Sequence, residues 1–369
     1  MAPEVNIRGM DEIILGNIKI GDGHLFKIIV DGCQNHMRSV SRAKEMCQAA
    51  KECGADIIKW QLNIAEEEMV KDEAIAASKD ILAKWGSIWH FVEKFAMPAD
   101  GILEIKEYCE KIGIEFLCTP FSLKAAGILN EMGVHSFKIG SGETEDLPMI
   151  EEIAKMGKPM LVSTGMTEIE EIDLTVNAIK DAGTPFALLH CMSIYDSLKT
   201  DRFQLGVIKV LKERYNVPVG FSDHTPPEGI KDTFGRSIEQ EPLIWGAIAS
   251  GACFIEKHFT LDRKQPDADS CFSLDPHALQ QLKNQVRAAE SAMNSERRVF
   301  EQEKPVAIWA KRSIVAKKDL IPGAVITRED ITSKRPGTGI RSKDYRQILG
   351  KKIKNNILSG QLIKWEDLE

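Results

Sequence analysis

Eight short apolar runs, each followed by an amphipathic stretch, constrain the fold of this chain most strongly. The runs cover residues 26–31, 55–61, 114–120, 135–141, 159–165, 186–191, 217–224 and 252–258. The stretches between them carry apolar residues at helical spacing, and most end in Gly or Asn, as helices do. A strand followed by a helix, eight times within about 270 residues, predicts a (β/α)8 barrel of the α/β class. A doubly wound open sheet is the alternative, although no G-x-G-x-x-G motif follows the first run.

Beyond the last helical pattern the chain changes character, and a charged stretch, SERRVFEQEK, marks a domain boundary. We expect a barrel with an amino-terminal extension, a linker and a small β-rich domain, over residues 1–295, 296–305 and 306–369. The small domain contains an internal echo, in which Gly323 matches Gly360 and Asp330 matches Asp367, both 37 residues apart. A unit of this size is too small to hold an active site of its own.

Charge and composition limit the partners. The net charge of −7 and the absence of a long basic stretch argue against nucleic acid and anionic membranes as partners. No apolar stretch approaches the roughly 18 residues of a spanning helix, and the amino terminus lacks the pattern of a secretory signal. The eight cysteines are scattered singly, as reduced thiols are in cytoplasmic proteins. These features predict a cytoplasmic location.

Polar residues gather where the predicted strands end, and in a barrel all these ends meet at one mouth. His224 and His258 each close an apolar run and are flanked by Asp223 and Glu256. Because neutral imidazole binds first-row divalent metals, the pair predicts a metal site. Other strand ends contribute Asp31, Asn35, His36, Lys59, Gln61, Thr119, Lys138, Ser141, Glu143, Ser163, Thr164, His190, Ser193 and Ser222. Single members have simpler explanations: His190 is more readily a hydrogen-bonded core residue than a functional one.

Two lysines sit inside otherwise apolar strands. An uncompensated buried ammonium costs several kcal/mol, so Lys59 and Lys138 require anions. Together with Ser141, Ser163 and Ser222, which stand in glycine-containing turns, they form a cradle for a phosphate and a carboxylate. The alternative is a Schiff-base aldolase in which Lys138 is the nucleophile.

The interval between the second and third strands is longer than the others and contains Trp85, Trp89 and His90. It is interpreted as an extra loop and helix over the barrel mouth. A substrate lid and a helix that packs on the barrel wall are equally compatible with the pattern.

Nine short motifs follow one another along the whole chain. They are NH (35–36), GADxxKxQ (54–61), TPF (119–121), KIGSGE (138–143), STGM (163–166), ALLHC (187–191), SDHT (222–225), EKHFT (256–260) and KRPGTG (334–339). In this order and spacing they resemble the N-acetylneuraminate (sialic acid) synthases. The resemblance implies a (β/α)8 barrel joined to a small antifreeze-like (SAF) domain.

The resemblance also implies an activity. Such enzymes are phosphoenolpyruvate-dependent transferases that join phosphoenolpyruvate to the aldehyde of an N-acylhexosamine, such as N-acetylmannosamine, giving a nine-carbon 3-deoxy-2-keto acid and phosphate. By this resemblance, the phosphoenolpyruvate ligands are Lys59, Lys138, Ser141, Ser163, Ser193 and Ser222. The sugar ligands are Gln61, Tyr195 and Arg335, and the catalytic carboxylates are Asp31, Glu143 and Asp267. His224 and His258 would hold a divalent metal, Mn²⁺ or else Mg²⁺ or Co²⁺, and Arg335 would reach the site of a partner subunit in a domain-swapped homodimer.

Several positions depart from the family pattern on the inferred sugar side. Asp31 replaces the usual Glu, Met37 and Arg38 replace a Gly, and Ser193 replaces an Asn. The acceptor is therefore open: a diacetamido-trideoxy sugar of the legionaminic or pseudaminic type, or a phosphorylated or unacetylated hexose, is the alternative to N-acetylmannosamine. A binding protein with a degenerate site would bind phosphoenolpyruvate without releasing phosphate.

Overall fold

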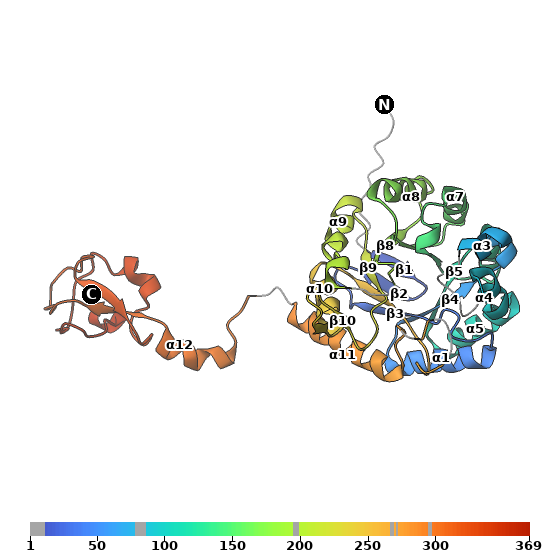
Figure 1. The fold of residues 1–369 in the computed structure, drawn as a ribbon. Helices are drawn as coiled ribbons and strands as arrows, with labels where there is room; N and C mark the ends of the chain where they lie inside the picture. The colour runs from blue at the N-terminus through green and yellow to red at the C-terminus, as the bar shows by residue number, and fades with distance from the viewer. Residues whose placement is uncertain (1–11, 78–85, 195–198, 266–268, 271, 294–296) are drawn as a thin grey trace, which may run out of the picture. The chain divides into compact units, whose positions relative to one another are not determined.

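The computed structural model describes residues 12–77, 86–194, 199–265, 269–270, 272–293 and 297–369. The chain separates into two compact units, residues 1–294 and 295–369. Figure 1 shows the first unit as a ring of helices around a barrel of strands. Each unit is described by itself below.

Eight parallel strands close the barrel of the first unit. They are β3 (Lys27–Asp31), β4 (Ile57–Leu62), β5 (Glu115–Pro120), β6 (Phe137–Ile139), β7 (Met160–Ser163), β8 (Phe186–Cys191), β9 (Val219–Asp223) and β12 (Phe254–His258). Pairing of β12 with β3 completes the ring and sets His258 opposite Asp31. The prediction of a (β/α)8 barrel is confirmed.

The helices lie outside the strands (Figure 1). Those of the barrel are α1 (Val40–Cys53), α5 (Ala99–Ile112), α6 (Leu123–Glu131), α7 (Leu147–Lys155), α8 (Ile169–Asp181), α9 (Gly206–Tyr215), α10 (Glu241–Ala249) and α11 (Pro276–Ala292). Two predicted carboxyl-terminal caps are present: Gly54 ends α1 with a φ of 94°, and Asn216 ends α9 with a φ of 54°. Both adopt the left-handed backbone that these residue types accept most readily.

Small elements close the amino end of the barrel. The hairpin of β1 (Glu12–Leu15) and β2 (Ile18–Gly21) places Ile13, Leu15 and Ile20 in one apolar cluster with the inward-facing strand residues. The hairpin therefore closes the barrel at the amino ends of the strands. The mouth at the carboxyl ends remains open to a ligand.

The long interval before β5 holds three short helices, α2 (Ala65–Glu68), α3 (Lys71–Ala77) and α4 (Ile88–Phe95). Trp89 is buried in a small cluster with Ala65 and Val92. This cluster joins α4 to α2 and α3 and is separate from the core cluster of the barrel, so the lid and the barrel-wall interpretations both stay predictions. Trp85 lies outside the described residues. A further hairpin, β10 (Ile230–Lys231) and β11 (Ser237–Ile238), follows β9.

The second unit contains α12 (Lys304–Ala310), β13 (Ser313–Ala316), β14 (Ile331–Lys334) and the 3-10 helices η4 (Ser342–Gln347) and η5 (Trp365–Asp367). The internal echo of the sequence is a structural repeat. Gly323 and Gly360 both have a φ of 86°, and Asp330 and Asp367 each accept a hydrogen bond from the backbone amide three residues earlier. The second copy forms a one-turn 3-10 helix, η5, at this point, and the first copy does not.

Two general expectations concern the whole chain. Among the described residues, no helix is long and apolar enough to cross a membrane. The seven cysteines within the described segments are free thiols.

Candidate active site

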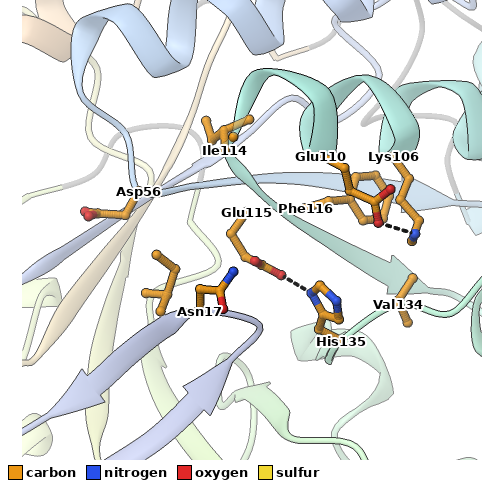
Figure 2. A pocket seen from close by; sticks show the side chains of 11 residues that line it. Asn17, Asp56, Lys106, Glu110, Ile114, Glu115, Phe116, Val134 and His135 are labelled. Carbon is orange, nitrogen blue, oxygen red and sulfur yellow. Dashed lines mark hydrogen bonds and ion pairs between the residues drawn. The ribbon is translucent and has the colours of Figure 1, made fainter.

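Cavities lie at both ends of the barrel, and their chemistry differs. The one at the amino ends of the strands measures about 290 Å³ and is drawn in Figure 2. Its charged side chains pair with one another: Lys106 Nζ lies 2.5 Å from Glu110 Oε1, and His135 Nδ1 lies 2.8 Å from Glu115 Oε1. Pairs at this end of such a barrel serve stability. The candidate site is therefore the opposite cavity.

The cavity at the carboxyl ends of the strands measures about 220 Å³. Thirteen of the residues named from the sequence line it: Asp31, Lys59, Gln61, Thr119, Lys138, Ser141, Glu143, Ser163, Ser193, Ser222, His224, Glu256 and His258. Tyr195 and Asp267 lie outside the described residues, and Arg335 belongs to the second unit.

Strand alternation decides which polar residues face this cavity. On β12, Glu256 and His258 point inward, whereas Lys257 between them is fully buried in the outer layer. Lys257 Nζ lies 3.0 Å from Asp223 Oδ2, so this carboxylate turns away from the cavity. Of the two carboxylates that flank the histidines in the sequence, only Glu256 belongs to the site.

Lys59 forms the centre of a buried ion cluster. Its Nζ lies 2.8 Å from Asp31 Oδ2 and 3.1 Å from Glu256 Oε1, with all three side chains almost fully buried. Burial alone would lower the pKa of Lys59, but the two carboxylates raise it well above its usual value. Burial likewise opposes ionisation of Asp31, yet the Lys59 ammonium holds the pKa of Asp31 well below its usual range. These shifts keep both Lys59 and Asp31 charged.

Lys138 is less well compensated. Its side chain is 2% exposed, and its Nζ donates to the Ile139 carbonyl at 2.9 Å and to Ser163 Oγ at 2.7 Å. Within the described part of the chain, the carboxylate that pairs with it is Glu256, whose Oε2 lies 3.9 Å away. Burial lowers the pKa of Lys138. An anion in the cavity would supply the missing negative charge.

Hydroxyl groups and a close backbone line the wall beside Lys138. Ser141 Oγ accepts a hydrogen bond from the Gly165 amide at 3.2 Å. A Cβ at Gly165 would lie 2.4 Å from Ser193 Oγ, so only glycine allows this approach. Ser222 Oγ donates to Glu256 Oε1 at 3.3 Å. Such a wall can donate several hydrogen bonds to a phosphate or carboxylate.

The two histidines meet at the cavity rim. Their ring centroids are 5.1 Å apart, and Phe272 packs edge-on against both rings. Burial lowers the pKa of His258 to about 3, which keeps its imidazole in the neutral form that binds metals. Within the described residues, ligand atoms of Asp31, Cys33 and His258 lie within 4.8 Å of one another. This set of one imidazole nitrogen, one carboxylate and one sulfur fits a divalent ion, and His224 is not among its three members.

Some residues at the strand ends serve the scaffold. Asn35 Nδ2 donates to the Phe259 carbonyl at 2.9 Å, and His190 Nε2 lies 2.7 Å from the Phe203 carbonyl. The interpretation of His190 as a hydrogen-bonded core residue therefore describes its position. Glu256 was not given a role from the sequence, although its place two residues before His258 puts it on the same strand face.

Glu143 borders the cavity with an unusual environment. Burial raises the pKa of its carboxyl to about 7, and no hydrogen-bond partner of its Oε2 is found among the described residues. A carboxyl that titrates near neutral pH can either give or take a proton there.

The raised pKa of Glu143 predicts a pH dependence of stability. Between its usual pKa of 4.5 and about 7, the folded state holds a proton that the unfolded state has lost. The free energy of unfolding should therefore fall by about 1–3 kcal/mol as the pH rises through this window. Urea unfolding of the barrel at a series of pH values should show this slope in the wild type and a flatter one in Glu143→Gln. The exposed neighbour serves as control: a flattening equally large in Glu145→Gln would contradict the assignment.

Comparisons with known proteins agree with one another. The NeuB family matches residues 46–298, and the SAF domain matches residues 311–369. An N,N'-diacetyllegionaminic acid synthase of Campylobacter jejuni is 33% identical over 91% of this chain and 98% of its own. An uncharacterized protein of Methanocaldococcus jannaschii is 37% identical over 97% of this chain and 99% of its own. The crystal structure of an N-acetylneuraminic acid synthetase from Leptospira borgpetersenii, in complex with citrate, has a TM-score of 0.66 and 30% identity over 80% of this chain and 94% of that one.

Proposed function

Because the chain belongs to the NeuB family and ends in a SAF domain, we propose that it condenses phosphoenolpyruvate with the aldehyde of an N-acylhexosamine. The products would be a nine-carbon 3-deoxy-2-keto sugar acid of the sialic acid type and inorganic phosphate. The observation that carries the proposal is Lys138: its buried ammonium lies 3.9 Å from its carboxylate partner and faces a cavity lined by hydroxyl groups. A doubly anionic ligand such as phosphoenolpyruvate compensates this charge.

The donor would be held by the wall around Lys138. Lys138 and Ser163 share a hydrogen bond and would together contact the anionic groups of phosphoenolpyruvate, with Ser141, Ser193 and Ser222 completing the cradle. Lys59 is already paired with Asp31 and Glu256, so its role would be to fix these carboxylates and to contribute positive potential.

The reaction then divides into balanced steps. The C3 carbon of phosphoenolpyruvate attacks the aldehyde carbon, the C=O π electrons pass to the aldehyde oxygen, which takes up a proton, and an oxocarbenium centre remains at C2. Water adds to C2 and loses a proton. The resulting hemiketal phosphate expels phosphate by C–O cleavage, as its hydroxyl loses a proton and becomes the C2 ketone. Glu143, whose pKa lies near neutral pH, is the carboxyl that we assign to proton transfer at this water, with Asp31 and Asp267 as the other candidates.

A divalent metal, Mn²⁺ in the first instance and Mg²⁺ or Co²⁺ otherwise, would be held by His224 and His258. When bound, such an ion supplies Lewis-acid polarisation of the aldehyde oxygen. The neutral state of the His258 imidazole supports this assignment. The acceptor would lie between these histidines and Gln61, with Tyr195 as a further contact.

The acceptor that we propose is an N-acylated hexosamine, and two choices stand out. The relative from Campylobacter jejuni supports a diacetamido-trideoxy sugar, and the structure from Leptospira borgpetersenii supports N-acetylmannosamine. Asp31 favours the first choice slightly, because its shorter carboxylate leaves more room at the inferred sugar side.

A phosphate-release assay tests the proposal. The protein is incubated with phosphoenolpyruvate, Mn²⁺ and a panel that includes both acceptors, their 6-phosphates where these exist, and the unacetylated hexosamines. Release of phosphate that requires one acceptor and stops with a chelator is the expected result. If no acceptor in the panel leads to phosphate release, the synthase assignment is wrong. Borohydride trapping of substrate on Lys138 would favour the aldolase instead.

Arg335 provides a separate test of the quaternary proposal. Its guanidinium stacks 5.5 Å from the ring centroid of Trp309 in the second unit, which holds it in place. We propose that in a domain-swapped homodimer this group contacts the acceptor in the partner's barrel. Arg335→Ala should then raise the KM for the acceptor by about tenfold, the loss of one charge-assisted contact, and leave the KM for phosphoenolpyruvate within about twofold. Arg346→Ala in the same domain is the control, and an unchanged acceptor KM in Arg335→Ala would contradict the swap.

The cytoplasmic location stays a prediction.

A further inference from the structure

Cys33 lies beside the histidine that we assign to the metal, although the sequence pattern gave it no role. Its side chain is buried, and its Sγ lies 2.8 Å from Nδ1 of His258. The two residues are 225 positions apart in the chain and meet only because β12 pairs with β3. We infer that Cys33 is itself a metal ligand and that it makes the site of this chain selective for softer divalent ions. This inference rests on the metal site of the proposed function.

The distances fit a shared ion. One ligand atom each of Asp31, Cys33 and His258 lies within 4.8 Å of the others, the only such group of three or more found among the described residues. Metal–ligand bonds of about 2.0–2.3 Å hold the ligand atoms of one tetrahedral ion roughly 3–4 Å apart. Small side-chain rotations therefore suffice to bring carboxylate oxygen, sulfur and imidazole nitrogen to one centre. The ring centroid of His224 lies 5.1 Å from that of His258.

The backbone at Cys33 is held in an unusual conformation. Its φ is 42°, in the left-handed region that residues other than glycine rarely adopt. Two hydrogen bonds fix it: the Cys33 amide donates to Asp31 Oδ1 at 3.0 Å, and the Gly32 amide donates to the Lys59 carbonyl at 2.9 Å. This turn leaves the sulfur 2.8 Å from Nδ1 of His258, whose side chain lines the cavity.

The chemistry of binding is simple. The thiol loses its proton to solvent as the sulfur–metal bond forms, because the thiolate is the ligand. Thiolate sulfur is a soft donor, and it favours Zn²⁺, Fe²⁺ or Co²⁺ over Mn²⁺ and Mg²⁺. Because Asp31 already pairs with Lys59, the Cys33 thiolate would supply the additional negative charge beside a divalent ion.

Cobalt is the probe that reports sulfur directly. Metal-free protein is titrated with Co²⁺ in the absence of phosphoenolpyruvate, and a thiolate-to-cobalt charge-transfer band is sought in the near ultraviolet. Dissociation constants for Co²⁺, Zn²⁺ and Mn²⁺ are then measured by competition with a chromophoric chelator. The test variant is Cys33→Gly, because glycine accepts the φ of 42° and the change removes the CH2–SH side chain without straining the backbone. The control is Cys253→Ala, a buried thiol that precedes β12 at the opposite end of the barrel.

The expected outcome is specific. The wild type and Cys253→Ala should show the band at one equivalent of Co²⁺, and Cys33→Gly should lack it. Cys33→Gly should bind Co²⁺ and Zn²⁺ more weakly by at least the roughly 10- to 100-fold that loss of a supporting residue costs, with a smaller change for Mn²⁺.

Two results would overturn the inference. One is stoichiometric Co²⁺ binding by the wild type without the band, and the other is equal Co²⁺ and Zn²⁺ affinity in Cys33→Gly. Phosphate release is measured separately, so the two proposals can fail independently. If the protein releases phosphate with Mn²⁺ but shows no charge-transfer band with Co²⁺, Cys33 is not a metal ligand and the synthase proposal stands. If the band is present but no phosphate is released, Cys33 is a metal ligand and the synthase proposal fails.

Discussion

Replacing Lys138 by methionine should lower kcat/KM for phosphoenolpyruvate by about 10³-fold, which corresponds to about 4 kcal/mol. The ammonium is buried, its carboxylate partner is 3.9 Å away, and it donates to Ser163, so a bound anion would be its main source of compensation. Methionine keeps the length and the burial of the side chain but removes the charge. Steady-state phosphate release with phosphoenolpyruvate varied at saturating acceptor measures the effect.

The control for Lys138 is a lysine without a role in the cavity. Lys155 on α7 is exposed and pairs with Glu152, so Lys155→Met should leave kcat/KM unchanged. The folded state of Lys138→Met should be at least as stable as the wild type, because the change removes a poorly compensated buried charge. A variant that folds and retains wild-type kcat/KM would exclude Lys138 from donor binding.

Replacing Lys59 by methionine should have its largest effect on stability. The change leaves Asp31 and Glu256 buried without the ammonium that lies 2.8 and 3.1 Å from them. Removing one partner of a buried ion pair costs about 3–5 kcal/mol, and we expect a loss of this size in the free energy of unfolding of the barrel. Urea unfolding followed by tryptophan fluorescence measures it, and the exposed lysine of the hairpin, in Lys19→Met, is the control.

A double variant tests the Lys59 prediction if Lys59→Met alone fails to fold. In Lys59→Met combined with Glu256→Gln, one of the two uncompensated carboxylates becomes neutral, so part of the lost stability should return. If Lys59→Met is as stable as the wild type, the ion pairs of Lys59 do not stabilise the barrel. The same follows if the double variant loses more free energy of unfolding than the two single variants lose together.

Many structural features of this protein can be predicted from short stretches of its sequence. The eight strands were predicted from short apolar runs because a parallel strand buried on both faces needs apolar residues nearly throughout its length. Gly54 and Asn216 were predicted as helix ends because few other residues accept a left-handed backbone. The matching positions of Gly323 and Gly360 could be recognised in the sequence because both residues adopt a left-handed backbone, which favours glycine. The lysines of the site stood out because an ammonium inside an apolar strand requires a partner.

The sequence by itself therefore determined the barrel, the small domain and the set of polar residues at the strand ends. Only the tertiary structure decided which of them share the cavity, because that depends on strand alternation and on the pairing of β12 with β3. These features turn Asp223 toward Lys257, place Glu256 between the two lysines, and bring Cys33 within 2.8 Å of His258. The contact of Cys33 with His258, 225 positions along the chain, is fixed by closure of the barrel, which no local pattern encodes.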